Sequence, residues 1–249
     1  MNAAQYWTQM QTDKNALMSR VERLSTLTLP HICLPLGLPH ETTAITNDFT
    51  SIGAQLAGHI TNKLGLTLFR PGVPFFRLGP DKKGKQELQK NGLTIDALTE
   101  MLSDAELEAV KELDRAAVRP KLNIILEHLV VTGNVLMCLE DDTIRAMGLR
   151  YYCVKRNYKG EVIRIVIREE MCKDELEDDV QGYAPGSSPE TKVCWYKLIQ
   201  RKGKRMVMTQ YIGDVLLPEE YNGSWPLEDC PYRPCVWLLP DDSNYGIGL

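Results

Sequence analysis

The segment from residue 122 to residue 139 limits the possible folds more than any other part of the sequence. Its apolar residues first follow the spacing of one helix face and then form a nearly continuous run, with Gly133-Asn134 as the break between the two patterns. Glycine is typical of the position just after a helix. The segment therefore predicts a buried helix over about 120–132 that passes directly into a buried strand over 135–139. The residues of the helical stripe are Leu122, Ile125, Leu126, Leu129 and Val130.

A first helix is expected over residues 2–24. Apolar residues recur along it at helical spacing, which predicts that one face is buried against the core. Residues 25–48 contain prolines and many threonines without a sustained period, so they are interpreted as a long ordered loop. The expected core-facing residues of the helix are Tyr6, Met10, Leu17, Val21 and Leu24, while Lys14, Arg20 and Glu22 are expected to point elsewhere.

Two more helices are expected before residue 120. One begins at Asp48, a good helix cap, and has an aliphatic residue at every fourth position from Ile52 to Leu64. The other covers residues 94–116 in two pieces, because Ser103 and Glu106 have the spacing of a capping box that starts a helix. Residues 75–78 are expected to form a short strand between the two helices.

The second half of the chain has the pattern of antiparallel hairpins. Residues 149–154 and 162–167 are expected to pair, as are residues 193–200 and 205–212, because turn residues separate the two members of each pair. Aliphatic residues alternate with arginines over 163–168, which predicts a half-solvated strand, and the acidic segment 169–180 is expected to be helical. The fold class is therefore α+β, with a mainly helical part over residues 1–142 and a β-rich part over 143–249.

Composition excludes several classes of protein. The chain has 249 residues, 43% hydrophobic and 25% charged, with a formal net charge of −4, so it is not a basic nucleic-acid clamp overall. No signal peptide is recognised at the N-terminus, and no apolar run approaches the roughly 18 residues of a membrane span. The seven cysteines are odd in number and spread along the chain, which favours buried free thiols in a reducing compartment.

The segment Gly79–Lys85 has the spacing of a phosphate-binding loop. The residue after it is Gln86, however, where such loops need a Ser or Thr hydroxyl to bind Mg²⁺, and Pro80 removes one of the amides that would hold phosphate. We interpret the segment as a solvated lysine-rich turn. The alternative that it leaves open is a phosphate-binding enzyme.

No other pattern predicts a catalytic or metal site. The acidic clusters are interpreted as solvated surface, and the spacing of Cys230 and Cys235, with two prolines between them, is poor for zinc. The four histidines show no recognisable acid or nucleophile partner. We therefore expect no catalytic residue, no cofactor and no metal. The acidic clusters are Glu140-Asp141-Asp142, Glu175 to Asp179 and Asp241-Asp242, and the histidines are His31, His40, His59 and His128.

Three stretches together resemble the portal, or head-to-tail connector, family of short-tailed phages. Residues 51–78 are similar to an early helix of that family, followed by an "LF-P" turn and an aromatic-Arg-Leu segment. Residues 126–141 are similar to its "L-V-V-x-G-N-V-L" passage from helix to strand. Residues 230–248 resemble its "CPY-x-P … YG-x" segment, which precedes a long stem helix. The order and spacing of the three stretches also agree with the family.

The resemblance implies a structural subunit and not an enzyme. It implies a dodecameric ring at one capsid vertex, through which double-stranded DNA passes during packaging and ejection. The implied partners are further copies of the chain, the major capsid protein, tail adaptor proteins and the large subunit of the terminase, which hydrolyses the ATP. The implied location is the virion, with assembly in the host cytoplasm and no membrane. A different virion component, such as a tail adaptor or a minor capsid protein, is the alternative.

The resemblance covers about the first half of a family member. It implies a portal wing that lacks the stem, clip and crown regions. The residues that approach DNA most closely in the family would therefore lie beyond the part that is matched.

Overall fold

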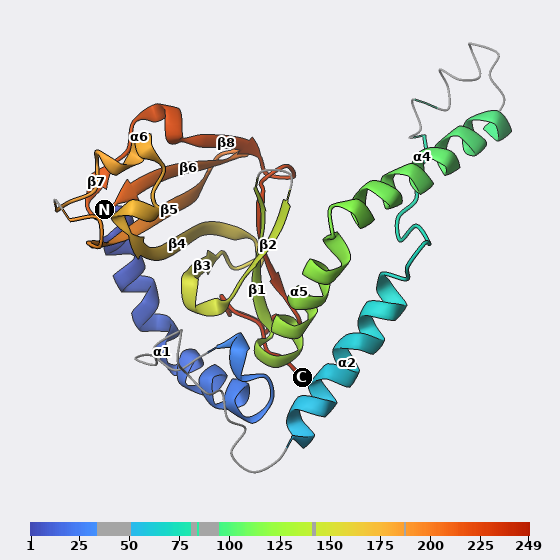
Figure 1. The fold of residues 1–249 in the computed structure, drawn as a ribbon, viewed down its shortest axis with the longest axis horizontal. Helices are drawn as coiled ribbons and strands as arrows, with labels where there is room; N and C mark the ends of the chain where they lie inside the picture. Colours follow the sequence, from blue (N-terminus) through green and yellow to red (C-terminus); the bar gives the residue numbers. More distant parts are fainter. Residues whose placement is uncertain (34–50, 81–83, 85–94, 141–142, 187) are drawn as a thin grey trace.

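The computed structural model describes residues 1–33, 51–80, 84, 95–140, 143–186 and 188–249. Figure 1 shows a body made of two β-sheets with helix α1 along one side, and an arm of two helices that extends away from it. The arm is formed by α2 (Ile52–Leu68) and α4 (Ile95–Arg115), and α5 (Val118–Thr132) joins it to the body. The expected α+β class is confirmed.

The larger sheet has the strand order β3-β4-β5-β6-β7, and β8 also pairs with β6. All of its pairs are antiparallel, and the two predicted hairpins are confirmed, except that residues 149–151 of the first form a short helical turn and not part of the strand. The strands are β3 (Tyr152–Arg156), β4 (Val162–Cys172), β5 (Lys192–Lys202), β6 (Arg205–Ile212), β7 (Val215–Leu216) and β8 (Gly223–Pro226).

Helix α1 (Ala3–Leu27) packs against this sheet. It begins at a capping box in which the side chains of Asn2 and Gln5 each accept a hydrogen bond from the other residue's backbone N–H. The helix was predicted, and Met10 and Val21 are buried as expected; Lys14, which was expected to point elsewhere, is also fully buried, and Tyr6 is only half-buried. The residues that α1 buries are Ala3, Trp7, Met10, Lys14, Met18, Val21 and Ser25.

Strand β4 is buried on both faces at its centre, contrary to the prediction of a half-solvated strand. Ile165 and Ile167 belong to the main core, while Val166, on the opposite face, packs in a second cluster with Trp7 of α1. Arg164 lies 3.8 Å above the centre of the Tyr6 ring. The expected alternation fails because a helix from the start of the chain covers the face that was assigned to solvent.

The acidic segment after β4 is not one helix, as the sequence predicted. Strand β4 continues to Cys172, and two short helical pieces follow, η3 (Lys173–Glu175) and α6 (Asp178–Gln181). The backbone of this connection folds back on itself, since Lys173 N–H donates to the carbonyl of Thr191 at 3.0 Å. The connection therefore closes the end of the β4–β5 hairpin.

The smaller sheet has the order β2-β1-β9, with all pairs antiparallel. Its strands are β1 (Asn134–Glu140), β2 (Thr143–Met147) and β9 (Tyr232–Val236). The predicted passage from a buried helix into a buried strand is confirmed: α5 ends at Gly133, whose φ of 73° is left-handed, and β1 begins at the next residue. On α5, Ile125, Leu126 and Val130 are buried, whereas Leu122 and Leu129 are only partly buried.

The arm corrects three local predictions. Its helix α4 is continuous, and Ser103 lies inside it and does not start a new piece. Residues 75–78 are not a strand; the backbone N–H of Leu78 instead donates to the carboxylate of Glu106 at 2.6 Å. Glu106 was assigned to a capping box, but its side chain accepts this hydrogen bond from Leu78 instead.

Helix α2 starts after Ser51 and not at Asp48. It packs on α5 through the small residues Ala57 and Thr61, while Ile52 and Leu56 are 61% and 58% exposed. Asp48 and residues 34–48 of the expected loop lie outside the described residues. A short turn, η1 (Pro30–Ile32), follows α1 within the remainder of that loop.

Candidate functional site

The strongest candidate site is a crossing between the Gly133–Asn134 turn and the last residues of the chain. The side-chain amide of Asn134 donates to the carbonyl of Gly246 at 2.8 Å, and the N–H of Gly246 donates to the Asn134 side-chain oxygen at 2.7 Å. Asn134 is 1% exposed. A buried amide that satisfies both backbone groups of another residue fixes the position of that residue closely. We call the contact between the Gly133–Asn134 turn and residues 246–249 the terminal crossing.

Gly133 is required at the terminal crossing for space as well as for conformation. A Cβ atom on Gly133 would lie 2.2 Å from the carbonyl carbon of Ile247 and 2.3 Å from the nitrogen of Gly248. Its positive φ also disfavours any residue that has a side chain. The tight approach lets Leu249 N–H donate to the carbonyl of Val130 at 3.0 Å, which satisfies a carbonyl at the end of α5.

Residues 232–245, which precede the terminal crossing, contact both sheets. Strand β9 pairs with β1, and the N–H of Trp237 continues that contact by donating to the carbonyl of Gly133 at 3.0 Å. Further along, the Asn244 side-chain oxygen accepts the N–H of Arg156, and the Tyr245 hydroxyl accepts the N–H of Val154. The segment therefore fixes α5, the small sheet and strand β3 relative to one another.

The three stretches that carry the family resemblance meet around α5 and β1. The middle stretch contains the end of α5 and β1, and the last stretch contains β9 and the terminal crossing. The first stretch contributes α2, whose Gly65 lies directly against the side chain of Asn123 on α5. Sequence reasoning found the stretches but did not predict these contacts.

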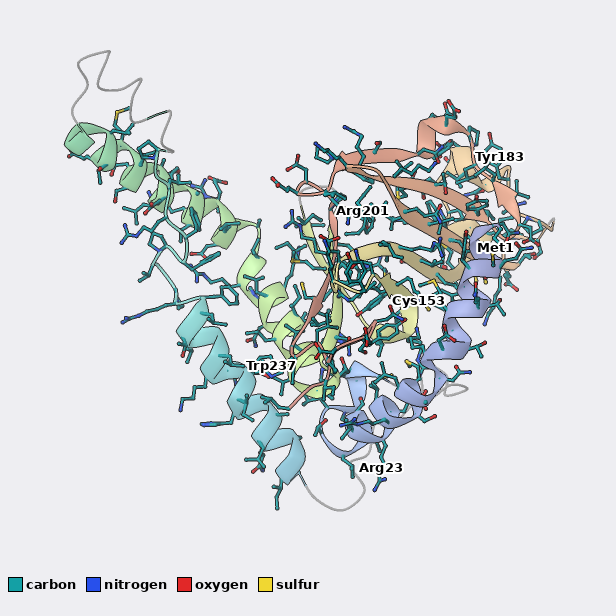
Figure 2. All side chains as sticks on the ribbon, turned by 180° about the vertical axis from the view of Figure 1, so that it is seen from behind. Met1, Arg23, Cys153, Tyr183, Arg201 and Trp237 are labelled. Atoms are coloured by element: carbon teal, nitrogen blue, oxygen red, sulfur yellow. The ribbon has the colours of Figure 1, made fainter. Side chains whose placement is uncertain are left out.

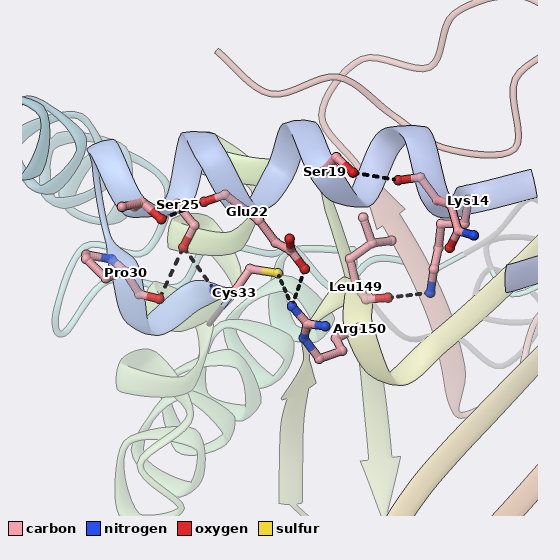
Figure 3. A network of polar contacts seen from close by, with 10 residues as sticks. Lys14, Ser19, Glu22, Ser25, Pro30, Cys33, Leu149 and Arg150 are labelled. Carbon is pink, nitrogen blue, oxygen red and sulfur yellow. Dashed lines mark hydrogen bonds and ion pairs between the residues drawn. The ribbon is translucent and has the colours of Figure 1, made fainter. Parts of the chain in front are cut away.

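A second group of polar contacts fixes α1 to the body (Figure 3). The buried amine of Lys14 donates to the carbonyls of Leu149 and Tyr152, each at 2.8 Å, and burial lowers the pKa of this amine. Two turns further along α1, Glu22 accepts a hydrogen bond from Arg150 at 2.6 Å. These contacts reach the turn η2 (Leu149–Tyr151) and the first residue of β3, which follows it. Lys14, predicted to point away from the core, is thus a central contact of α1.

Glu140 was predicted to be solvated surface, and this prediction was wrong. Its carboxylate accepts hydrogen bonds from the amine of Lys197 at 2.7 Å and from the hydroxyl of Tyr232 at 2.6 Å. Burial alone would raise the pKa of Glu140, but these two hydrogen bonds, together with the positive charges of Lys197 and Arg145, hold the pKa below its ordinary value. The residue connects β1, β5 and β9 at the end of the small sheet. Asp141 and Asp142 lie outside the described residues.

The other acidic clusters have structural partners or are exposed. Glu175 accepts the N–H of Cys172 at 2.7 Å, and Asp179 accepts the hydroxyl of Tyr221 at 2.6 Å. Asp241 and Asp242 are exposed. Among the described residues, no hydrogen bond or ion pair joins the carboxylates of these two clusters to a base or to a carboxylate from another element.

The histidines differ from one another in their surroundings. His31 lies 3.3 Å from the carboxylate of Glu127, so the prediction that it has no acid partner was wrong. His128 is buried on α5, and burial lowers its pKa to about 4, with a smaller effect from His31. His59 is exposed on α2, and His40 lies outside the described residues.

All seven cysteines are free thiols, as expected from their spacing. Cys230 is buried and Cys235 is half-buried. In the part of the chain that the structure describes, no three His, Cys, Asp or Glu side chains are grouped so that they could hold a metal ion. Most of the Gly79–Lys85 segment lies outside that part, and the strand that should precede a phosphate-binding loop is a non-regular segment. None of the described helices is long and apolar enough to cross a membrane.

Comparison with known proteins identifies the family of the chain. The family described as "Bacteriophage head to tail connecting protein" matches residues 1–249. The portal protein of Pseudomonas phage phiKMV is 28% identical over 256 residues, which cover 99% of this chain and 49% of that protein. The portal protein of Escherichia phage T7 is 23% identical over 258 residues, which cover 98% of this chain and 47% of that protein. The chain thus spans about half the length of these relatives, and it belongs to the bacteriophage head-to-tail connecting protein family.

Proposed function

We propose that this chain forms the wing of a phage portal subunit, a structural part of a ring at one capsid vertex. The observation that carries the proposal is the family match over residues 1–249. The terminal crossing supports it physically, because it holds the last residues of the chain firmly against α5 and β1. A wing that braces a ring needs its helices and sheets fixed to one another, and the terminal crossing joins α5, β1 and residues 246–249.

The proposed partners follow from this role. They are further copies of the chain in a dodecameric ring, the major capsid protein, tail adaptor proteins, the large terminase subunit and the double-stranded DNA that the ring admits and releases. The proposed location is the virion, after assembly in the host cytoplasm. No catalytic role is proposed, because the side chains of Lys14 and Glu140 are engaged in contacts that hold elements together.

The proposed division of the wing is a mainly helical part over residues 1–142 and a β-rich part over 143–249. The first part contains the arm, which leaves aliphatic side chains such as Leu56 and Leu66 exposed. The second part contains the large sheet. The pairing of β1 with β2 and β9 joins the two parts across this boundary.

Labelling of intact virions tests the proposal. Gold-conjugated antibodies raised against the chain should bind at a single vertex per particle once the tail has been removed, and should not label the rest of the shell. Label on many vertices would indicate a minor capsid protein. Label that leaves with the detached tail would indicate a tail adaptor.

A further inference from the structure

Two hairpin tips lie side by side at one end of the large sheet. In the register of the sheet, Lys155 of β3 is opposite Arg164 of β4, which in turn is opposite Gln200 of β5. The β3–β4 turn over residues 157–160 and the β5–β6 turn over residues 203–204 therefore emerge at the same end. They are two strand spacings apart, which is roughly 10 Å. We call residues 155–161 and 201–205 the basic tips.

The basic tips carry a concentrated positive charge on a chain whose net charge is −4. They contain seven cationic side chains and one carboxylate, Glu161. The connection at the opposite end of the sheet, residues 173–191, contains six carboxylates and one lysine. Arg201 and Tyr183 mark these two ends in Figure 2. The cations are Lys155, Arg156, Lys159, Arg201, Lys202, Lys204 and Arg205.

The arginines and the lysines of the basic tips have different roles. Arg156 donates to the carbonyls of Asn244 and Gly160, and Arg201 pairs with Glu161 at 2.8 Å, so these guanidinium groups hold the tips in shape. The lysines are exposed and take part in no ion pair within the described residues. Four amines are therefore available to an anionic partner: those of Lys155, Lys159, Lys202 and Lys204.

A cavity of about 320 Å³ opens beside the tips, where Glu161 and Arg201 line it together with Arg233. Arg233 donates to the carbonyls of Cys230 and Glu228. The rest of the lining is Val162, Ile165, Met206, Leu227, Cys230, Tyr232 and Pro234. The roughly 10 Å between the tips is comparable with the width of about 12 Å of the DNA major groove, which separates the phosphates of the two strands. Exposed amines on two tips at this separation can therefore reach phosphates of both strands of a duplex.

A protein partner fits this surface less well. Protein–protein interfaces are depleted in lysine and need an apolar centre. Around the tips the exposed large apolar side chains are Tyr158, 82% exposed, and Leu227, 37% exposed; Leu227 lines the cavity, and Tyr158 does not. Non-specific binding of nucleic acid, in contrast, comes mainly from cations that neutralise phosphates.

We propose that the basic tips bind the phosphate backbone of duplex DNA without reading its sequence. The choice of a duplex rests on the proposed portal function, in which the subunit meets a packaged genome. The four exposed lysines supply the contacts, and the arginines set their positions. The carboxylates of residues 173–191, at the opposite end of the sheet, make the chain as a whole anionic. Contact with the DNA phosphates is therefore confined to the basic tips.

The test is fluorescence anisotropy of a labelled 30-base-pair duplex with the 249-residue chain at several salt concentrations. Four phosphate contacts predict a slope of about −3.6 in log affinity against log salt, which means a loss of roughly 100-fold between 50 and 200 mM. The variant that removes the contacts should lose at least about 10-fold in affinity at 50 mM salt, with a slope near zero. That variant combines Lys155→Gln, Lys159→Gln, Lys202→Gln and Lys204→Gln.

A matched control removes the same charge elsewhere on the surface and should bind within about twofold of the unchanged chain. Equal thermal unfolding of the two variants shows that both are folded. Absence of DNA binding at 50 mM salt, equal loss in both variants, or a change in self-association in place of DNA binding would each overturn the inference. Vertex labelling of virions is independent of this result, so the proposed portal function can stand without it. The control combines Arg20→Gln, Arg23→Gln, Lys63→Gln and Lys192→Gln, all exposed.

Discussion

The side chain of Asn134 pairs with the backbone of Gly246 as a neighbouring strand would, accepting its N–H at 2.7 Å and donating to its carbonyl at 2.8 Å. The two residues are 112 positions apart. The pair connects the start of β1 to the last residues of the chain at the point where α5 ends. One buried amide therefore fixes the position of residues 246–249 against the end of α5 and the start of β1.

Asn134→Ala should lower the free energy of unfolding by about 2 kcal/mol or more, because both backbone groups of Gly246 would lose their buried partner. Urea unfolding followed by fluorescence measures this change. Asn134→Asp should also destabilise the protein, since a carboxylate cannot donate to the Gly246 carbonyl. Asn62→Ala, at an exposed position on α2, should change stability by less than about 0.5 kcal/mol. Equal effects of Asn134→Ala and Asn62→Ala would show that the pair does not form.

Two glycine substitutions should have opposite effects. Gly133→Ala places a methyl group 2.2 Å from the backbone of residue 247 at a φ of 73°, and should cost at least about 2 kcal/mol. Gly58→Ala, within α2 and with no atom near the added methyl, should stabilise the protein by about 0.5–1 kcal/mol. Thermal unfolding distinguishes them, and a stable Gly133→Ala variant would contradict the terminal crossing.

Replacement of Lys14 by Met should lower the free energy of unfolding by roughly 2–3 kcal/mol. The apolar side chain fills similar space, but the carbonyls of Leu149 and Tyr152 lose a charged donor. Lys63→Met, at an exposed position on α2, is the matched control and should be nearly neutral. Hydrogen exchange should also increase along α1 in the Lys14 variant. An unchanged exchange pattern would mean that Lys14 does not hold the helix in place.

Stability should fall as the pH is lowered from about 6.5 to about 4 because of His128. Burial lowers the pKa of His128 to about 4, so the unfolded chain binds a proton in this window while the folded chain does not. The free energy of unfolding should therefore rise with pH across the window, by about 3 kcal/mol in total.

His128→Leu should remove most of this pH dependence, whereas His59→Gln, at an exposed position on α2, should leave it unchanged. Unfolding in urea at pH 4.5 and pH 7 measures the difference for each variant. If His128→Leu kept the full slope, this assignment of the pH dependence to His128 would be contradicted.

Local patterns predicted much of the fold. The passage from α5 through Gly133 into β1 and the two long hairpins follow from periodicity and turn residues within short segments. The polar contacts could not be predicted in the same way. The partners of Lys14 lie more than 130 residues away in the sequence. Without a visible partner, a lysine is predicted to be exposed, because charged side chains are rarely buried unless they are paired.

The candidate site shows the same limit. Asn134 was recognised as part of a helix end, a local role, but its bonds to Gly246 depend on how the terminal segment returns to α5. Glu140 was assigned to the surface because its neighbours in sequence are acidic, whereas Lys197 and Tyr232 come from other strands. Resemblance identified the segments, and the structure was needed to show that they touch.

Electron microscopy of the protein purified from its complete reading frame tests the central claim most directly. End-on views should show closed rings of twelve subunits around a central channel, with the 249-residue chain forming the outer part of each subunit. Six-fold tail rings, or stable monomers beside a separate protein that forms the ring by itself, would contradict the assignment of this chain to a portal wing.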